Sequence, residues 1–234
     1  DVIGVDSLDG LLGDIPVEHR HPDLNLDAGL SEQELSTVFG SIAAENASAS
    51  AGYISFLGAG SYSHYIPSTV RSILQRGEFV TAYTPYQPEA AQGTLQVGFE
   101  FQTVICQLTG MEVANAGMYD GPTAFAEACL MASRVTKRTK IGVLSTSDQR
   151  LPNTLLAYSM YQGIDIVEIS PDATEIPDDI ACIGVQSPNF FGEIEDVERL
   201  TNLAHANGAL SVVHVNPTAL GMFKAPGEFD VDIV

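Results

Sequence analysis

The second half of the chain alternates between short apolar runs and amphipathic segments. The apolar runs have the length and the β-branched content of buried strands. They lie at 141–144, 164–169, 181–185 and 210–215. Helical patterns at 153–161 and 197–206 separate them, and the glycine after each, Gly163 or Gly208, predicts a helix C-cap. Strands that alternate with helices predict an α/β domain with a mostly parallel sheet covered on both faces.

The first half of the chain has a helical pattern. Ser31 and Glu34 have the spacing of a capping box and predict the start of a helix. Its apolar stripe has a period of about 3.6 residues. The stripe consists of Leu35, Val38, Phe39 and Ile42. We therefore expect residues 1–50 to form a helical N-terminal arm and residues 51–234 to form the α/β large domain.

Three more helices are expected between the arm and the strands. Pro67 suits the first turn of a helix that runs to Leu74. The others span 95–108, with Gly110 as a C-cap, and 122–134.

The chain ends on a segment, 229–234, that predicts a strand in the middle of a sheet. A domain seldom ends on an uncovered apolar strand. We therefore expect the large domain to be incomplete at its C-terminus and the chain to be truncated.

Composition and charge exclude several classes of function. The 234 residues include 30 acidic and 10 basic side chains, a formal net charge of −20, which repels nucleic-acid backbones. No apolar run approaches the ~20 residues of a membrane helix, and the N-terminus has no signal-peptide pattern. His19 and His21 lack companion carboxylates at metal-ligand spacing, so no metal site is expected. Three cysteines without CxxC spacing favour free thiols in a reducing cytoplasm.

A loop rich in tyrosine, 83–93, is the first candidate for chemistry. Pro85 and Pro88 stiffen it, so its hydroxyls, amides and rings can be presented to a ligand at a low entropic cost. The alternative is a surface connection whose tyrosines cover the core. The candidate side chains are Tyr83, Thr84, Tyr86, Gln87 and Gln92.

A glycine-rich loop is the second candidate. Gly58 and Gly60 allow a close backbone approach to a ligand or to another chain. The candidate side chains are Ser61, Tyr62 and His64, although His64 could equally be a hydrogen-bonded loop residue.

These two loops belong to a series of motifs in a fixed order. The motifs are FLGAGSYSHYIP at 56–67, YTPYQPEAAQG at 83–93, LTGM at 108–111 with ANA at 114–116, MYDG at 118–121 and PNFFG at 188–192. The series resembles the glycine dehydrogenase (decarboxylating) family, the P-protein of the glycine cleavage system. The resemblance covers most of the chain from about residue 30 onward. It is most similar to the separate α subunit (subunit 1) of two-subunit bacterial and archaeal enzymes.

The resemblance implies a pyridoxal 5'-phosphate enzyme of fold type I and an oxidoreductase subunit in the cytoplasm. It implies that this chain, with a glycine dehydrogenase β subunit, decarboxylates glycine and transfers the aminomethyl group to the lipoyl group of H-protein. It also implies that the β subunit holds most of the cofactor and carries the Schiff-base lysine, so this chain is expected to be inactive alone. Two alternatives remain, a structural scaffold and a self-sufficient pyridoxal-phosphate enzyme.

The residues themselves depart from a complete cofactor site. Lys137 and Lys140 lie in a basic run at a helix end, and Lys224 lies in a predicted turn. None of them has the setting of a desolvated nucleophile.

The phosphate cup that the family fold implies should be a helix N-terminus with free N–H groups. Here Asp120 would cap that helix and Pro122 removes a donor, so Asp120, Gly121 and Thr123 are interpreted as a vestigial cup. Asn216 stands where the family usually has the aspartate that pairs with the pyridine nitrogen. His214 is interpreted as a sheet histidine rather than a base. The phenylalanines of 188–192 could be core plugs or interface anchors, and their enrichment at interfaces favours the second.

Overall fold

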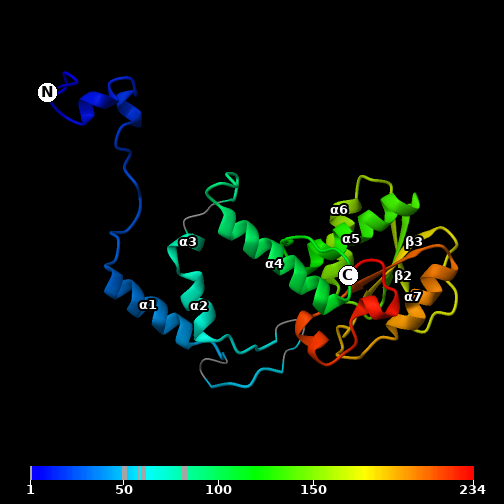
Figure 1. The fold of residues 1–234 in the computed structure, drawn as a ribbon. Coiled ribbons are helices and arrows are strands. Elements are labelled where there is room, and N and C mark those ends of the chain that lie inside the picture. The colour runs from blue at the N-terminus through cyan, green and yellow to red at the C-terminus, as the bar shows by residue number, and fades with distance from the viewer. Residues whose placement is uncertain (1, 49–51, 57, 59–61, 81–83) are drawn as a thin grey trace. The chain divides into compact units, whose positions relative to one another are not determined.

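A computed structural model describes residues 2–48, 52–56, 58, 62–80 and 84–234 (Figure 1). The chain divides into two compact units, Asp1–Phe56 and Leu57–Val234, and each is described by itself.

The described part of the first unit is helical. It contains two 3₁₀ helices, η1 (Asp9–Leu12) and η2 (Val17–His19), and one α-helix, α1 (Glu32–Ala44). The predicted capping box is present, because the Ser31 hydroxyl accepts from the Glu34 N–H at 3.4 Å and Glu34 Oε2 accepts from the Ser31 N–H at 2.9 Å. No residue of α1 is buried, so its predicted apolar stripe faces solvent in this unit.

The second unit contains a parallel sheet of four strands, β1 (Lys140–Leu144), β2 (Asp165–Ile169), β3 (Ile180–Gln186) and β4 (Leu210–His214). Their order in the sheet is β2-β1-β3-β4. The strands match the four apolar runs to within a residue or two at each end. Because parallel strands need crossover connections, the sheet confirms the predicted α/β architecture.

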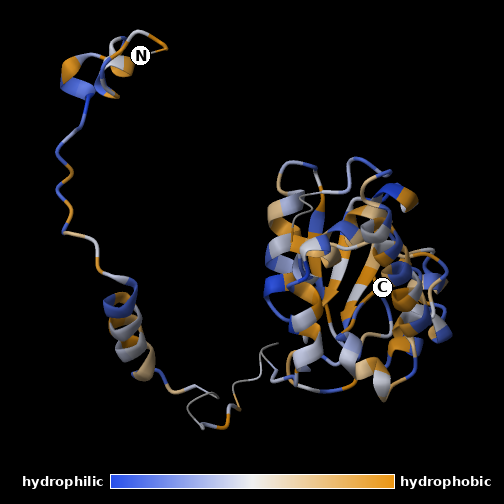
Figure 2. Cartoon of the chain, turned by 60° about the vertical axis from the view of Figure 1, so that its left-hand side comes forward, coloured by the Kyte–Doolittle hydropathy of each residue, from blue (hydrophilic) through white to orange (hydrophobic). Residues whose placement is uncertain are grey.

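Helices cover both faces of this sheet. Side chains alternate along each strand, so neighbouring residues enter different cores. The α5 (Gly121–Thr136) and α6 (Arg150–Ser159) helices pack on the face that contains Ile141, Val143 and Val212. The α7 helix (Val197–Ala206) packs on the opposite face with Leu144, Ile183 and Val213. Figure 2 shows the strands between them as largely hydrophobic.

The remaining helices of this unit are less covered. They are α2 (Ser68–Leu74), α3 (Gly77–Val80) and α4 (Gln92–Thr109). Pro67 is the N-cap of α2 rather than its first residue, and Gly110 ends α4 in the left-handed conformation at φ 75°, as predicted. In α2 and α3 no residue is buried, and Thr109 is the one buried residue of α4.

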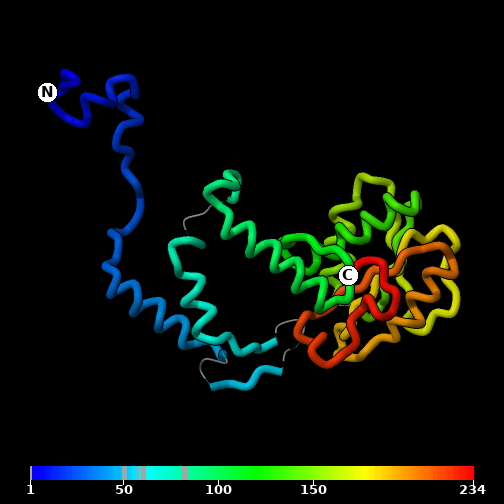
Figure 3. Tube along the Cα trace, in the orientation of Figure 1, coloured from blue at the N-terminus to red at the C-terminus, as the bar shows by residue number. Residues whose placement is uncertain are grey.

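The C-terminal segment differs from the expected strand at 229–234. After β4 the chain forms η4 (Pro217–Gly221) and η5 (Pro226–Phe229), which Figure 3 traces near its red end. Asp230 follows in the left-handed conformation at φ 60°, which breaks the extended backbone. Only a single parallel bridge remains, between Ile233 and Val212. The segment therefore returns to the edge of β4 but does not form the predicted strand.

Candidate functional site

Four polar side chains gather where three parallel strands end. Asp148 and Arg150 follow β1, Gln186 ends β3 and His214 ends β4. In open α/β sheets, ligands bind at the carboxyl edge of the strands. We call these four residues the edge cluster.

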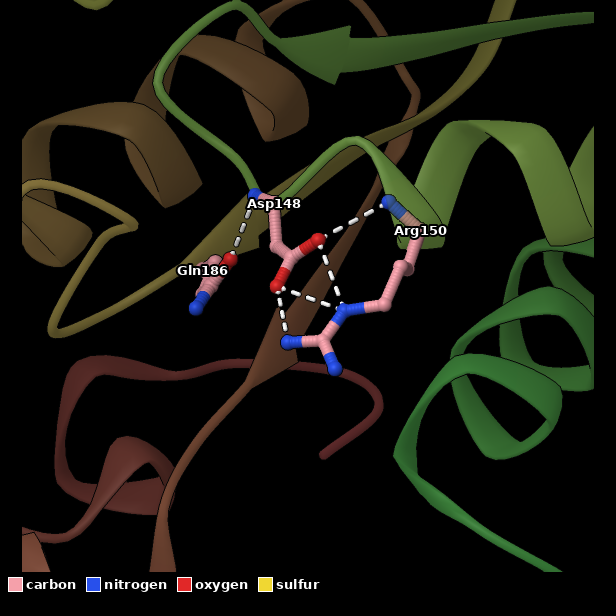
Figure 4. A network of polar contacts seen from close by, with 3 residues as sticks. All are labelled: Asp148, Arg150 and Gln186. Carbon is pink, nitrogen blue, oxygen red and sulfur yellow. Dashed lines mark hydrogen bonds and ion pairs between the residues drawn. The ribbon is translucent and has the colours of Figure 1, made fainter. Parts of the chain in front are cut away.

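Asp148 is the centre of the edge cluster (Figure 4). Arg150 Nε lies 3.0 and 2.9 Å from the two carboxylate oxygens of Asp148, and the Arg150 N–H donates to Oδ1 at 2.9 Å. The Asp148 N–H donates to Gln186 Oε1 at 2.7 Å, which joins the ends of β1 and β3. The Arg150 guanidinium lowers the pKa of the Asp148 carboxyl, so this nearly buried side chain stays ionised.

His214 is packed rather than free. Its ring meets the Phe125 ring edge-on, with centroids 6.3 Å apart. A Cβ at Gly121 would lie 2.7 Å from His214 Cε1, so only glycine fits at the start of α5. Burial lowers the pKa of His214, and the Arg150 charge lowers it further while Asp148 opposes both. This packing supports the interpretation of a neutral sheet histidine.

One hydroxyl beside the edge cluster has no partner. Ser147 Oγ is buried, and it is the one buried side-chain oxygen or nitrogen without a hydrogen bond among the described residues. It precedes Asp148 in the connection from β1 to α6. Since buried polar groups are normally satisfied, this oxygen is available to a water or a ligand group.

One sequence-predicted residue lies within electrostatic range of the edge cluster. Asp148 raises the pKa of the Arg150 guanidinium, and Tyr62 adds a smaller contribution in the same direction. His64 is exposed in the same loop. Ser61 lies outside the described residues.

The tyrosine loop is exposed where it is described. Thr84, Tyr86 and Gln87 precede α4, and Tyr86 is 79% exposed. Gln92 is the first residue of α4. Tyr83 lies outside the described residues. The loop is therefore accessible to another molecule, and its role in a site remains a prediction.

The start of α5 does not fit a phosphate. Asp120 Oδ1 accepts from the Thr123 N–H at 2.9 Å, and Thr123 Oγ1 accepts from the Asp120 N–H at 3.2 Å. These bonds lower the pKa of Asp120, so a negative charge already occupies the helix end. Pro122 supplies no N–H. The interpretation of Asp120, Gly121 and Thr123 as a vestigial cup stays a prediction.

The other two parts of a pyridoxal-phosphate site do not fit either. Asn216 is neutral, and its Oδ1 caps η4 by accepting from the Thr218 N–H at 3.0 Å. Lys137 ends α5, Lys140 pairs with Asp179 at 2.8 Å, and Lys224 lies 5.2 Å from the centre of an aromatic ring. These three are all the lysines of the sequence. The residues at these positions therefore do not have the settings that a pyridoxal-phosphate site needs.

Within the described part of the chain, other classes of site are also missing. No group of three histidine, cysteine or acidic side chains there could hold a metal ion. None of the described helices has both the length and the apolar content to cross a membrane. The three cysteines are free thiols.

Asp148, Arg150 and Gln186 were missed by sequence reasoning. The signal that could have found Asp148 is the polar run that follows the first buried strand, 145–148. Gln186 could be placed beside it only once the order of the strands was known.

Comparisons with known proteins agree with these features. A family model described as glycine cleavage system P-protein matches residues 1–234. A probable glycine dehydrogenase (decarboxylating) subunit 1 of Desulfitobacterium hafniense is 48% identical over 242 residues, covering 99% of this chain and 54% of the relative. The corresponding protein of Geobacillus thermodenitrificans is 46% identical with the same coverage. The chain thus spans about half the length of the curated relatives it matches.

Comparison with solved structures identifies the same family. The crystal structure of a glycine decarboxylase (P-protein) in inhibitor-bound form has a TM-score of 0.86 and 38% identity, covering 99% of this chain and 53% of that chain. A sphingosine-1-phosphate lyase of Burkholderia pseudomallei has a TM-score of 0.56 at 12% identity, covering 85% of this chain and 50% of that one. The latter similarity concerns the fold alone, which is fold type I of the pyridoxal-phosphate-dependent enzymes, as predicted. The chain belongs to the glycine cleavage system P-protein family.

Proposed function

We propose that this chain is part of the α subunit of a glycine-decarboxylating P-protein, and that it completes an active site with a β subunit. The observation that carries the proposal is that the fold is retained while the negative charge of Asp120 occupies the start of α5, where a phosphate would bind. With its partner, the chain would decarboxylate glycine and transfer the aminomethyl group to the lipoyl group of H-protein. The reaction would take place in the cytoplasm, where free cysteines stay reduced.

The β subunit supplies the cofactor in this proposal. Pyridoxal phosphate, when bound there, provides the electron sink for the carbanion that decarboxylation leaves. Asp120 and Asn216 weaken an independent site in this chain, because one repels phosphate and the other cannot pair with a pyridinium by charge.

This chain contributes side chains to the shared site. Tyr83, Thr84, Tyr86, Gln87 and Gln92 are proposed to shape its glycine and lipoyl end. The supporting observation is that Tyr86 and Gln87 are exposed on a loop that Pro85 and Pro88 stiffen. The second set of side chains proposed for the shared site comes from the glycine-rich loop and consists of Ser61, Tyr62 and His64.

The edge cluster would help to position the side chains of the glycine-rich loop. Asp148 holds the Arg150 guanidinium in place, and Arg150 lies within electrostatic range of Tyr62. The edge cluster would therefore position Tyr62, while the tyrosine loop meets the substrate.

A reconstitution experiment tests the tyrosine loop. The β subunit is mixed with α subunit that carries Tyr86→Phe or Gln87→Ala, and glycine decarboxylation is measured. Loss of one positioned polar contact is expected to lower the rate by about tenfold or more. Tyr161→Phe is the matched control, because Tyr161 is exposed in the turn that follows α6. Unchanged turnover in an intact complex would reject the role of the loop.

A scaffold role is the second candidate, and the exposed stripe of α1 favours it. Leu35, Val38, Phe39 and Ile42 form an apolar helix face that the first unit leaves uncovered. A scaffold predicts that Phe39→Asp breaks assembly with the β subunit, whereas the tyrosine-loop variants keep full turnover. The proposed shared site predicts reduced turnover in those loop variants while assembly is retained.

A further inference from the structure

The loop that follows β3 is built on a buried asparagine. Asn189 Nδ2 donates to Glu195 Oε1 at 2.7 Å and to Glu193 Oε2 at 3.1 Å. Its Oδ1 accepts from the N–H groups of Phe191 and Glu193 at 2.9 and 3.0 Å. Thr146 Oγ1 donates to the same Glu195 oxygen at 2.6 Å. A fully satisfied buried amide holds the loop in one conformation.

This rigid loop presents apolar side chains to solvent. Phe190, Phe191 and Ile194 are 40%, 69% and 54% exposed, so the phenylalanines are not core plugs. The two rings meet edge-on with centroids 5.4 Å apart. Because the backbone is already ordered, binding to this surface would lose little conformational entropy. Exposed aromatic side chains on an ordered loop are typical of a protein interface.

An apolar cavity of about 200 Å³ opens beside the loop. Its lining comes from the loop, from β4 and from the segment that contains η4 and η5. The apolar lining residues include Pro188, Ile194, Val213, Leu220, Phe223 and Phe229. A cavity of roughly 150 Å³ can hold benzene, so this one has room for a large apolar side chain.

The surroundings of the cavity are strongly acidic. Four carboxylates occur in the six residues 193–198. The cations nearby already have contacts, because Arg199 pairs with Asp196 at 3.9 Å and donates to the Ala173 carbonyl at 2.7 Å, while Lys224 lies over the Phe229 ring. The whole chain has a formal net charge of −20, which opposes the approach of a second copy. Charge complementarity therefore favours a cationic partner.

We propose that the loop 187–194 and the cavity beside it form a docking site for a partner protein segment in which a large apolar side chain is flanked by lysine or arginine. The apolar side chain fills the cavity and packs on Phe191, and the flanking cations meet the carboxylates of 193–198. This inference does not depend on the proposed catalytic role, since it uses none of the residues assigned to that role.

A peptide with two leucines between pairs of lysines is the probe. Its binding to the intact chain is measured by fluorescence anisotropy as salt rises from about 10 mM to about 1 M, which shortens the screening length from about 30 Å to about 3 Å. We expect binding at low salt that weakens as salt rises. Phe191→Ser is expected to weaken it about tenfold, as for an interface anchor, and Glu198→Gln several-fold.

Matched controls lie away from the loop. Tyr161→Ser changes an exposed aromatic ring in the turn after α6, and Glu168→Gln changes an exposed carboxylate in β2; both should leave binding unchanged. The four substituted residues are all exposed, so these variants should fold. They are Phe191, Glu198, Tyr161 and Glu168. Equal binding of a peptide with glycines in place of the leucines, or of one with glutamates in place of the lysines, would overturn the proposal. Self-association of the chain that Phe191→Ser abolishes would also overturn it, because a second copy would then be the occupant.

Discussion

At the scale of single residues, two glycines set how closely α5 approaches the sheet. A Cβ at Gly184 would lie 2.4 Å from Phe125 Cζ, and a Cβ at Gly121 would lie 2.7 Å from the His214 ring. Both contacts are made by side chains that cannot move freely, since Phe125 is buried and His214 packs against it. The missing Cβ atoms therefore allow α5 to lie against the carboxyl half of the sheet, beside the edge cluster.

Gly184→Ala is expected to destabilise the fold by about 1–3 kcal/mol, because the added methyl overpacks the contact with Phe125. Denaturant unfolding measures the change. Gly98→Ala in α4 is the control, since a Cβ there has no neighbour within 4 Å, and it should be neutral or stabilising by up to about 1 kcal/mol. Equal effects of the two variants would contradict the close packing.

His214 predicts a dependence of stability on pH. Burial lowers its pKa in the folded state, so the unfolded chain binds the proton more readily. The contribution of the neutral ring is complete above the unfolded pKa of about 6.5 and is lost as pH falls through the folded pKa. His214→Gln should therefore flatten the decline in unfolding free energy between about pH 7 and about pH 5. A variant whose decline matches that of the parent chain would show that His214 does not cause it.

At the scale of elements, the sequence predicted what depends on local pattern. The four strands and the helix caps at Ser31 and Gly110 were confirmed, because apolar runs, capping boxes and left-handed glycines act within a few residues. The strand at 229–234 was wrong, since Asp230 takes a left-handed conformation that apolar content does not reveal. The edge cluster was missed, because Asp148 meets Gln186 only through the order of the strands.

The cap of α5 is an element whose strength can be measured. Asp120→Ala removes the acceptor of the Thr123 N–H and is expected to destabilise the fold by about 0.5–2 kcal/mol. Asp178→Ala, at an exposed position before β3, is the control and should change stability by less than about 0.5 kcal/mol. If the two substitutions cost the same in urea unfolding, the capping box contributes nothing specific.

At the scale of the whole molecule, the chain keeps the family fold, while two of its described positions do not suit a pyridoxal-phosphate site. The helix end at Asp120 is already negative, and Asn216 is neutral. The apolar stripe of α1 and the exposed aromatic loop at 188–192 offer contact surfaces instead. The proposed function therefore predicts that this chain acts through the surfaces that it presents to a partner.

Borohydride reduction of the intact α subunit, with and without its β subunit and in the presence of pyridoxal phosphate, tests this central claim most directly. A Schiff base to a lysine becomes a stable secondary amine on reduction, and peptide mapping then locates it. The proposed function predicts label on the β subunit and none on any lysine of the α subunit, Lys137, Lys140 and Lys224 included. Stoichiometric label on any lysine of the α subunit, with glycine decarboxylation by that subunit alone, would contradict it.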